Sequence, residues 1–205
     1  MMHSIYSKIF FSSKKMGYCG NNVHIDPSVN IVGIHNLYMY DNTIIFGGST
    51  ILCTRAKFIM KKNSGAADGL TVVTGEHMPF VGRWFRDITD EDKDRLITGK
   101  SYDNDVIVEE DVLITTNVTL LSGIVVGRGA IIGSGSVCRF SIPPYAIVIG
   151  NPAKVVGFRF SPKLIIEHEK VLYPKEERLS LEDLEKNYKK YFLERIPEIT
   201  KFARL

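Results

Sequence analysis

The sequence has little of what marks a secreted, membrane-spanning or nucleic-acid-binding protein. Its three cysteines are odd in number and widely spaced, which excludes a disulfide framework and a Cys-x-x-Cys metal pattern and favours reduced thiols in a cytoplasmic protein. No apolar run approaches the about 18 residues of a membrane span, and the first residues lack the unbroken apolar core of a signal peptide. A net charge of +3 is too small to predict binding to nucleic acid.

What the sequence does contain is a six-residue period between Val106 and Val156. An apolar residue recurs at every sixth position, and a second one stands two positions before it. The two series are Val108, Ile114, Leu120, Val126 and Ile132, and Val106, Val112, Val118, Ile124 and Ala130. Six matches neither the helical nor the strand period. It predicts short strands joined by tight turns, three to a triangular coil, with the apolar residues inside and Gly, Asn and Asp at the corners.

Two segments of this period carry a family resemblance. The run Ile114–Val137, ITTNVTLLSGIVVGRGAIIGSGSV, and its continuation Ile142–Val156, IPPYAIVIGNPAKVV, resemble the hexapeptide-repeat acyltransferases. The resemblance implies an all-β solenoid, namely a left-handed parallel β-helix, that takes an acetyl group from acetyl-CoA and needs no metal. It also implies a homotrimer, because the family binds its carrier in a groove between adjacent subunits.

The rest of the chain is expected to divide around this solenoid. Residues 1–20 read as an N-terminal arm, and residues 21–158 as the β-helix, with about three less regular coils between Val23 and Thr74. The repeats stop for an excursion at about 78–103, and residues 159–205 form a helical extension that caps the open end. Caps predict the helices: Thr89 precedes an acidic turn, Pro162 follows Ser161, and Ser180 precedes the apolar stripe of the last helix.

Acyl transfer to a hydroxyl needs a general base, and histidine is favoured because its ordinary pKa lies near working pH. Of five histidines, His77 has the best context, since it ends a predicted strand and opens the excursion. In the sugar O-acetyltransferases that this chain resembles, a histidine at that place is the base. The residue that orients His77 stays open between Glu76, Asp68 and a main-chain carbonyl.

The resemblance also marks residues that would bind the carrier. Thr116 and Ser134 match positions that contact the pantetheine arm, and Gly133 lies beside Ser134. Lys154 matches a cation at the nucleotide phosphates, and Arg139 is a second candidate cation. Turn geometry alone explains the glycine, and Lys154 is equally well a solvated surface charge.

Three positions depart from the family pattern near this predicted carrier site. Leu113 stands where the family has a tryptophan, Thr115 replaces a glycine, and Phe140 replaces a lysine. These departures put the width of the groove and the nucleotide contacts in question.

The acceptor is expected to be a carbohydrate hydroxyl, as in the branch of galactoside O-acetyltransferase-like enzymes that modifies surface polysaccharides or their precursors. Trp84 is the one tryptophan and lies in the excursion beside Arg83, while Asn63 begins a run of small polar residues that lets a substrate approach the backbone. Packing against a neighbour explains Trp84 equally well, and a wide turn explains Asn63. The rival functions are N-acetylation of an amine, a scaffold without chemistry, and a metal-dependent hydratase.

Overall fold

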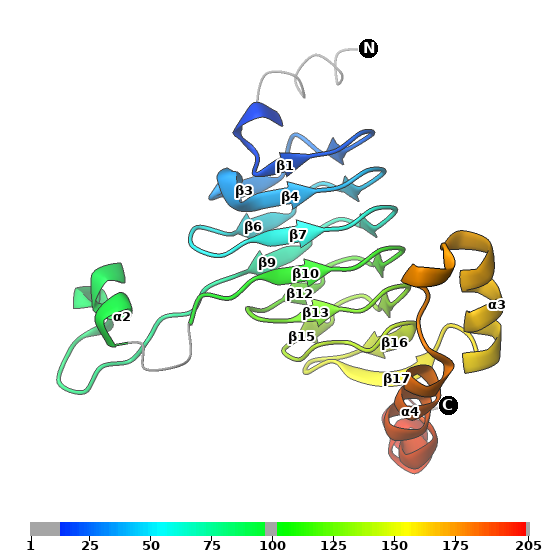
Figure 1. Ribbon diagram of the computed structural model, residues 1–205. Coiled ribbons are helices and arrows are strands. Elements are labelled where there is room, and N and C mark those ends of the chain that lie inside the picture. The colour runs from blue at the N-terminus through cyan, green and yellow to red at the C-terminus, as the bar shows by residue number, and fades with distance from the viewer. Residues whose placement is uncertain (1–12, 97–101, 204–205) are drawn as a thin grey trace.

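The computed structural model describes residues 13–96 and 102–203 of the chain. They form a parallel β-solenoid whose three faces are sheets of five, seven and five strands (Figure 1). The first sheet, called sheet A, holds β1 (Tyr18–Cys19), β4 (Leu37–Met39), β7 (Phe58–Met60), β10 (Val106–Val108) and β13 (Val125–Val126). Sheet B holds β2 (His24–Ile25), β5 (Ile44–Ile45), β8 (Gly65–Ala66), β11 (Leu113–Ile114), β14 (Ile131–Ile132), β16 (Ala146–Ile149) and β17 (Lys154–Phe158). Sheet C holds β3 (Asn30–Val32), β6 (Thr50–Leu52), β9 (Thr71–Val73), β12 (Thr119–Leu120) and β15 (Val137–Cys138).

Strand register confirms the predicted coils. In the regular half, β10, β11 and β12 each pair with the strand 18 residues later, one on each face: Ile107 with Val125, Leu113 with Ile131, and Thr119 with Val137. The earlier coils are longer, because Tyr18 pairs with Tyr38 and Ile44 with Gly65. These extra residues lie at the corners, which include the short helix η2 (Ile34–Asn36).

The solenoid is filled by the two apolar series of the period. All ten of these side chains are buried, and none is more than 2% exposed. Alternation explains the pattern: in β10 the first and third residues point inward and Ile107 points outward. Each inward side chain stacks on its copies in the coils above and below, so the coils share one continuous core.

One corner of the solenoid shows why asparagine recurs there. Asn22, Asn42, Asn63 and Asp111 all have φ between 53° and 60° at the turn between sheets A and B, a left-handed conformation that Asn and Asp tolerate best after glycine. The amides also form a ladder: Nδ2 of Asn22 donates to Oδ1 of Asn42 over 3.0 Å, and Nδ2 of Asn42 donates to Oδ1 of Asn63 over 3.1 Å.

The predicted excursion leaves the solenoid between β9 and β10, at the corner between sheets C and A (Figure 1). Its base is closed by an antiparallel bridge between Gly75 and Asp103, so it begins a few residues before the predicted boundary. It carries η3 (Phe85–Asp87) and α2 (Asp90–Leu96). Thr89 caps α2 as predicted, since its Oγ1 accepts from the backbone N–H of Asp92 over 3.3 Å.

The C-terminal extension begins after the antiparallel pair β16–β17. It comprises α3 (Pro162–Leu172), η4 (Lys175–Glu177), α4 (Leu181–Tyr191), η5 (Leu193–Arg195) and α5 (Ile196–Ala203). Helices α4 and α5 contact β17, the last strand, as expected of a cap. Helix α3 instead lies beside the last coils (Figure 1), where the buried carboxylate of Glu169 accepts from Tyr145 and Arg128 at 3.1 and 3.3 Å.

At the other end of the chain, η1 (Ser13–Lys15) leads into β1. Because β1 already pairs with β4, the solenoid starts at Tyr18, inside the segment assigned to the arm. The remainder of that predicted arm, residues 1–12, lies outside the described residues. Within the described part of the chain, no helix is both long and apolar enough to span a bilayer.

Candidate functional site

His77 lies where the excursion leaves the triangular β-solenoid, which is called the prism below. Strand β9 runs out through Thr74, whose carbonyl accepts from the N–H of Asn104 over 2.9 Å, and the N–H of Glu76 donates to the carbonyl of Tyr102 over 3.1 Å. The next residue, His77, is exposed. Together with Phe85 and Arg86 it lines an open depression with a volume of about 560 Å³. The backbone just before this histidine is therefore hydrogen-bonded to the returning chain, and its exposed side chain is accessible to a ligand.

Ion pairs hold the base of the excursion against the prism. Arg55, at the same corner one coil earlier, contacts Asp103 with its Nε at 2.8 Å and Asp90 with its Nη1 at 3.3 Å, and it also pairs with Asp94. The hydrogen bond to Asp94 raises the pKa of the Arg55 guanidinium. Lys93 adds a longer contact of 3.7 Å to Asp103. Helix α2 is therefore tied to the neck of the excursion, the bridge between Gly75 and Asp103, by Arg55 of the solenoid and by Lys93.

Glycine at position 75 leaves room for the Asp103 carboxylate at the neck. A Cβ atom on Gly75 would lie 2.4 Å from Oδ1 of Asp103. Since real Cβ atoms do not approach so closely, a side chain at position 75 would push the Asp103 carboxylate away from Arg55. In the Gly-Glu-His sequence, the histidine therefore lies two residues beyond the bridge between Gly75 and Asp103.

A second ion pair, between Arg83 and Asp92, stabilises the loop of the excursion before helix α2. Nη1 of Arg83 lies 2.8 Å from Oδ1 of Asp92, and Arg83 also donates to the carbonyl of Asp87. The Arg83 guanidinium and the hydrogen bonds from Thr89 hold the pKa of the Asp92 carboxyl well below its ordinary value. Arg83, predicted to bind substrate, is therefore engaged in holding the loop.

The other two predicted acceptor residues lie in different places. Trp84 is 81% exposed and its neighbour Phe85 is 65% exposed, but only Phe85 lines the depression with His77. Asn63 lies at the corner between sheets A and B, away from the excursion's corner, and its side chain accepts from Asn42. Within one chain the structure does not bring Asn63 to His77, and its substrate role stays a prediction.

The five predicted carrier residues fall into two groups. Thr116, Gly133 and Ser134 lie at successive turns between sheets B and C, where the N–H of Gly135 donates to the carbonyl of Thr116 over 3.0 Å. Thr116 and Ser134 are exposed. A Cβ on Gly133 would lie 2.6 Å from Cγ2 of Ile149, so close packing of the next coil explains that glycine. These turns form an exposed edge of small residues.

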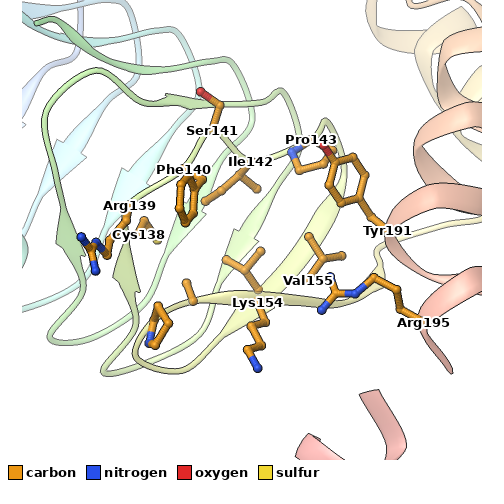
Figure 2. A pocket seen from close by; sticks show the side chains of 13 residues that line it. Cys138, Arg139, Phe140, Ser141, Ile142, Pro143, Lys154, Val155, Tyr191 and Arg195 are labelled. Atoms are coloured by element: carbon orange, nitrogen blue, oxygen red, sulfur yellow. The ribbon is translucent and has the colours of Figure 1, made fainter. Parts of the chain in front are cut away.

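Arg139 and Lys154 form the second group. They line one pocket of about 430 Å³ at the C-terminal end of the prism, between the last coil, β17 and the helical extension (Figure 2). Phe140, 75% exposed, lies in its wall, and Arg195 reaches toward it from the helical side (Figure 2). The two predicted phosphate-binding cations are thus brought together on a largely apolar pocket.

Two functional candidates were not found from the sequence. Arg55 gave no signal, since nothing in the sequence links it to residues about forty positions later. Arg195 lies in a short helix beyond the repeats, with its Nε 3.2 Å from Oε2 of Glu198. His168, expected to pack rather than to react, does so, with ring centroids 5.3 Å from Phe160 and 5.9 Å from Tyr145.

The described residues offer neither a metal cluster nor a reactive thiol. No group of three or more His, Cys, Asp or Glu side chains that could hold a metal occurs among residues 13–96 and 102–203. Burial raises the pKa of the Cys19 thiol, that of Cys53 to about 11 and that of Cys138 to about 12. None of these thiols is a nucleophile at neutral pH, because only the thiolate attacks.

Comparisons with known proteins show which solved structures share this fold. No protein-family model and no curated protein sequence matches the chain significantly. Among solved structures, a hexapeptide-repeat acetyltransferase of Vibrio cholerae with acetyl-CoA matches with a TM-score of 0.59 at 16% identity, over 76% of this chain and 83% of that one. A galactoside acetyltransferase with coenzyme A matches with a TM-score of 0.59 at 17% identity, over 86% and 85%.

A third neighbour transfers its acyl group to nitrogen. The N-acyltransferase AntD of Bacillus cereus, with dTDP and 3-hydroxybutyryl-CoA, matches with a TM-score of 0.53 at 18% identity, over 80% of this chain and 96% of that one. At these identities the likeness concerns the fold. The chain therefore has the solenoid fold of the hexapeptide-repeat acetyltransferases, as its own repeats predicted.

Proposed function

We propose that this protein is an acetyl-CoA-dependent O-acetyltransferase that acts on a hydroxyl of a carbohydrate, with His77 as general base. The observation that carries the proposal is the placement of His77. It is an exposed histidine that follows the hydrogen-bonded neck of the excursion, and it lines a depression large enough for a sugar ring. The same fold occurs in structures that hold acetyl-CoA or coenzyme A.

The chemistry needs both substrates bound at once. The imidazole of His77 takes the proton of the acceptor hydroxyl while its oxygen attacks the thioester carbonyl carbon. The tetrahedral intermediate collapses, the carbon–sulfur bond breaks, and the coenzyme A thiolate takes back the proton from the imidazolium. The products are an acetyl ester and free coenzyme A, and no acyl-enzyme forms, in line with the raised pKa values of Cys53 and Cys138.

The two groups of carrier candidates suit the two ends of the donor. Exposed turns at Thr116 and Ser134 offer backbone and hydroxyl partners for the amides of the pantetheine arm. Arg139 and Lys154 offer positive charge for the nucleotide phosphates, and lysine binds phosphate as a point charge. Phe140 and the apolar pocket wall give the adenine ring a surface against which to pack.

We expect the protein to act as a homotrimer, and the positions of these residues support that expectation. Thr116 and Ser134 lie along the edge between sheets B and C, whereas His77 lies at the edge between sheets C and A. A full sheet face separates these edges in one chain, so the turns of one copy complete the site only beside the His77 of another. The outward residues of sheet A are suited to such contacts because they are apolar on every strand: Tyr18, Tyr38, Ile59, Ile107 and Val125.

The experiment that tests the function is thiol release from acetyl-CoA with a panel of sugars and sugar nucleotides. Loss of a general base should lower kcat about a hundredfold or more, so His77→Asn should be nearly inactive. His35→Asn is the matched control, because His35 is also exposed but lies in η2, two coils before the excursion at the same corner, and does not line the depression. Equal rates in wild type and His77→Asn would refute the assignment of the base.

The oxygen acceptor has one rival with an observation behind it, since AntD shares the fold and is an N-acyltransferase. Product analysis distinguishes the two: an O-acetyl ester is cleaved by mild alkali, whereas an N-acetyl amide survives. An amide product would move the protein to the N-acyltransferases and leave His77 in the same role.

A further inference from the structure

The cations among the described residues of the excursion are paired with carboxylates, with one exception. Arg83 pairs with Asp92, Lys93 with Asp90 and Asp103, and Arg95 with Glu91. Arg55 of the prism further neutralises the acidic side of α2. It contacts the carboxylates of Asp90 and Asp94 on the helix and that of Asp103 at the neck. Among residues 76–96 and Tyr102, the described part of the excursion, Arg86 is the one cation without a carboxylate partner.

Arg86 is also the cation that shares a surface with the proposed base. It lines the same depression as His77 and Phe85. The acids closest to these residues in sequence, Glu76 and Asp87, do not line it. The depression therefore combines a base, an exposed aromatic ring and an uncompensated guanidinium, with no carboxylate in its lining.

From this juxtaposition we propose that the acceptor is an anionic carbohydrate, whose carboxylate or phosphate is bound by Arg86 while its ring packs on Phe85 and its hydroxyl faces His77. The inference rests on the proposed function and names the substrate class of that site. A guanidinium presents parallel N–H donors that match the two oxygens of a carboxylate or phosphate. An aromatic face suits the C–H surface of a sugar ring, and together the two contacts fix which hydroxyl approaches the base.

The expected size of the preference follows from the chemistry of the contact. Hydrogen bonds to charged groups contribute about 1.5–3 kcal/mol, which corresponds to roughly 10- to 100-fold in affinity. Because Arg86 is exposed, salt will weaken the contact. The preference for an anionic sugar should accordingly be at least about tenfold at low ionic strength and smaller in high salt.

The test measures binding and turnover for matched pairs of acceptors. One arm compares methyl glycosides of uronic acids with the corresponding neutral hexosides and uronamides, and a second compares sugar phosphates with the free sugars. The two arms distinguish a carboxylate from a phosphate as the recognised anion. Ligand-observed NMR reports binding without turnover, so it gives an answer even if thiol release from acetyl-CoA fails. Each pair is measured with wild type, Arg86→Gln, Arg86→Lys and the control Arg95→Gln.

The proposal predicts that in one arm the anionic member binds about tenfold or more tightly than its neutral partner. Arg86→Gln should abolish that preference, Arg86→Lys should keep part of it, and Arg95→Gln, which removes the same charge outside the depression, should keep all of it. Equal binding of the two members of every pair, or a preference that survives in Arg86→Gln, would overturn the anionic-acceptor proposal. The base assignment fails separately, through unchanged turnover in His77→Asn.

Discussion

The prism and the excursion are stabilised by different forces. In the regular coils the interior is apolar except for the buried Ser136, and its side chains are withdrawn almost entirely from water. In the excursion three apolar side chains, Val81, Trp84 and Phe85, are exposed, and the segment is held by ion pairs at its neck and within its loop. Burial makes the prism rigid without partners of its own, whereas the excursion depends on a few charged contacts to keep its shape. The proposed base lies at the junction of the two.

The largest effect expected from this contrast is on the core. Leu120→Ala removes a fully buried side chain and should lower the free energy of unfolding by about 2–5 kcal/mol, because it leaves a cavity between stacked coils. Val81→Ala shortens an apolar but fully exposed side chain. It should change the free energy of unfolding by less than about 0.5 kcal/mol. Urea unfolding followed by circular dichroism measures both. Similar losses for the two variants would show that the excursion is packed as tightly as the prism.

The second-largest effect expected is a loss of folding stability at alkaline pH. Burial raises the pKa of Cys138 from 9.0 and of Tyr173 from 10.0, each to about 12, and that of Cys53 to about 11. The unfolded chain therefore loses these protons first and binds fewer of them between about pH 9 and 12, so stability falls as pH rises. The slope is at most about 1.4 kcal/mol per pH unit for each group.

Urea midpoints measured across this alkaline window check the sign and the source. Cys138→Ala should flatten the pH dependence relative to wild type, since it removes one of the titrating groups, even if it lowers the midpoint at neutral pH. A midpoint that rises with pH would contradict the linkage.

The difference between the two regions also explains what the sequence could and could not predict. The prism is predicted by a repeat in which each six-residue unit buries the apolar residue at the same position. The buried positions of Val108 and Ile114 therefore predict that Leu120 and Val126 are buried too. Caps are local as well, and Thr89 and Ser180 were correctly expected to start helices, with Ser180 accepting from the N–H of Asp183 over 3.1 Å. No period or local motif joins Arg55 to Asp103, because their contact depends on how the excursion folds back.

The candidate site shows the same division. The strand expected before His77 predicted that this histidine opens the excursion. Trp84 and Arg83 were chosen as acceptor residues, whereas Phe85 and Arg86 share the depression with His77. Which excursion residues face His77 depends on how the excursion folds, and no period encodes that. Arg139 and Lys154 were identified through the family resemblance. That they line one pocket depends on β17 turning back antiparallel to β16, and the spacing of the repeats does not encode this reversal.

Breaking the neck should affect activity more than stability. Arg55→Met keeps much of the aliphatic stem but removes the contacts to Asp90, Asp94 and Asp103. We expect kcat to fall about tenfold or more because a misplaced base is costly, with the free energy of unfolding lowered by no more than about 1 kcal/mol. Arg55→Lys should restore part of kcat. The matched control is Arg95→Met, which removes an exposed pair with Glu91 and should change neither quantity.

A fall in the unfolding free energy of Arg55→Met as large as that of Leu120→Ala would mean that the neck supports the whole fold. In that case the excursion would be an integral layer of the solenoid rather than an attachment. Unchanged kcat in Arg55→Met would show that the position of His77 does not depend on the neck.

The smallest effect concerns the loop itself, and acid should reveal it. The pKa of Asp92 is held below its ordinary 3.8 by Arg83 and Thr89, so its contribution is present above about pH 4 and is lost as pH falls through the lowered value. The single tryptophan, Trp84, adjoins Arg83 and reports on the loop by fluorescence anisotropy, while circular dichroism reports on the prism. We expect anisotropy to drop in acid before the strand signal changes. Asp92→Asn should lower it already at pH 7, because the neutral amide lacks the charge that holds Arg83. A simultaneous loss of both signals in wild type would mean that prism and excursion unfold as one unit, and the contrast between them would then be one of composition alone.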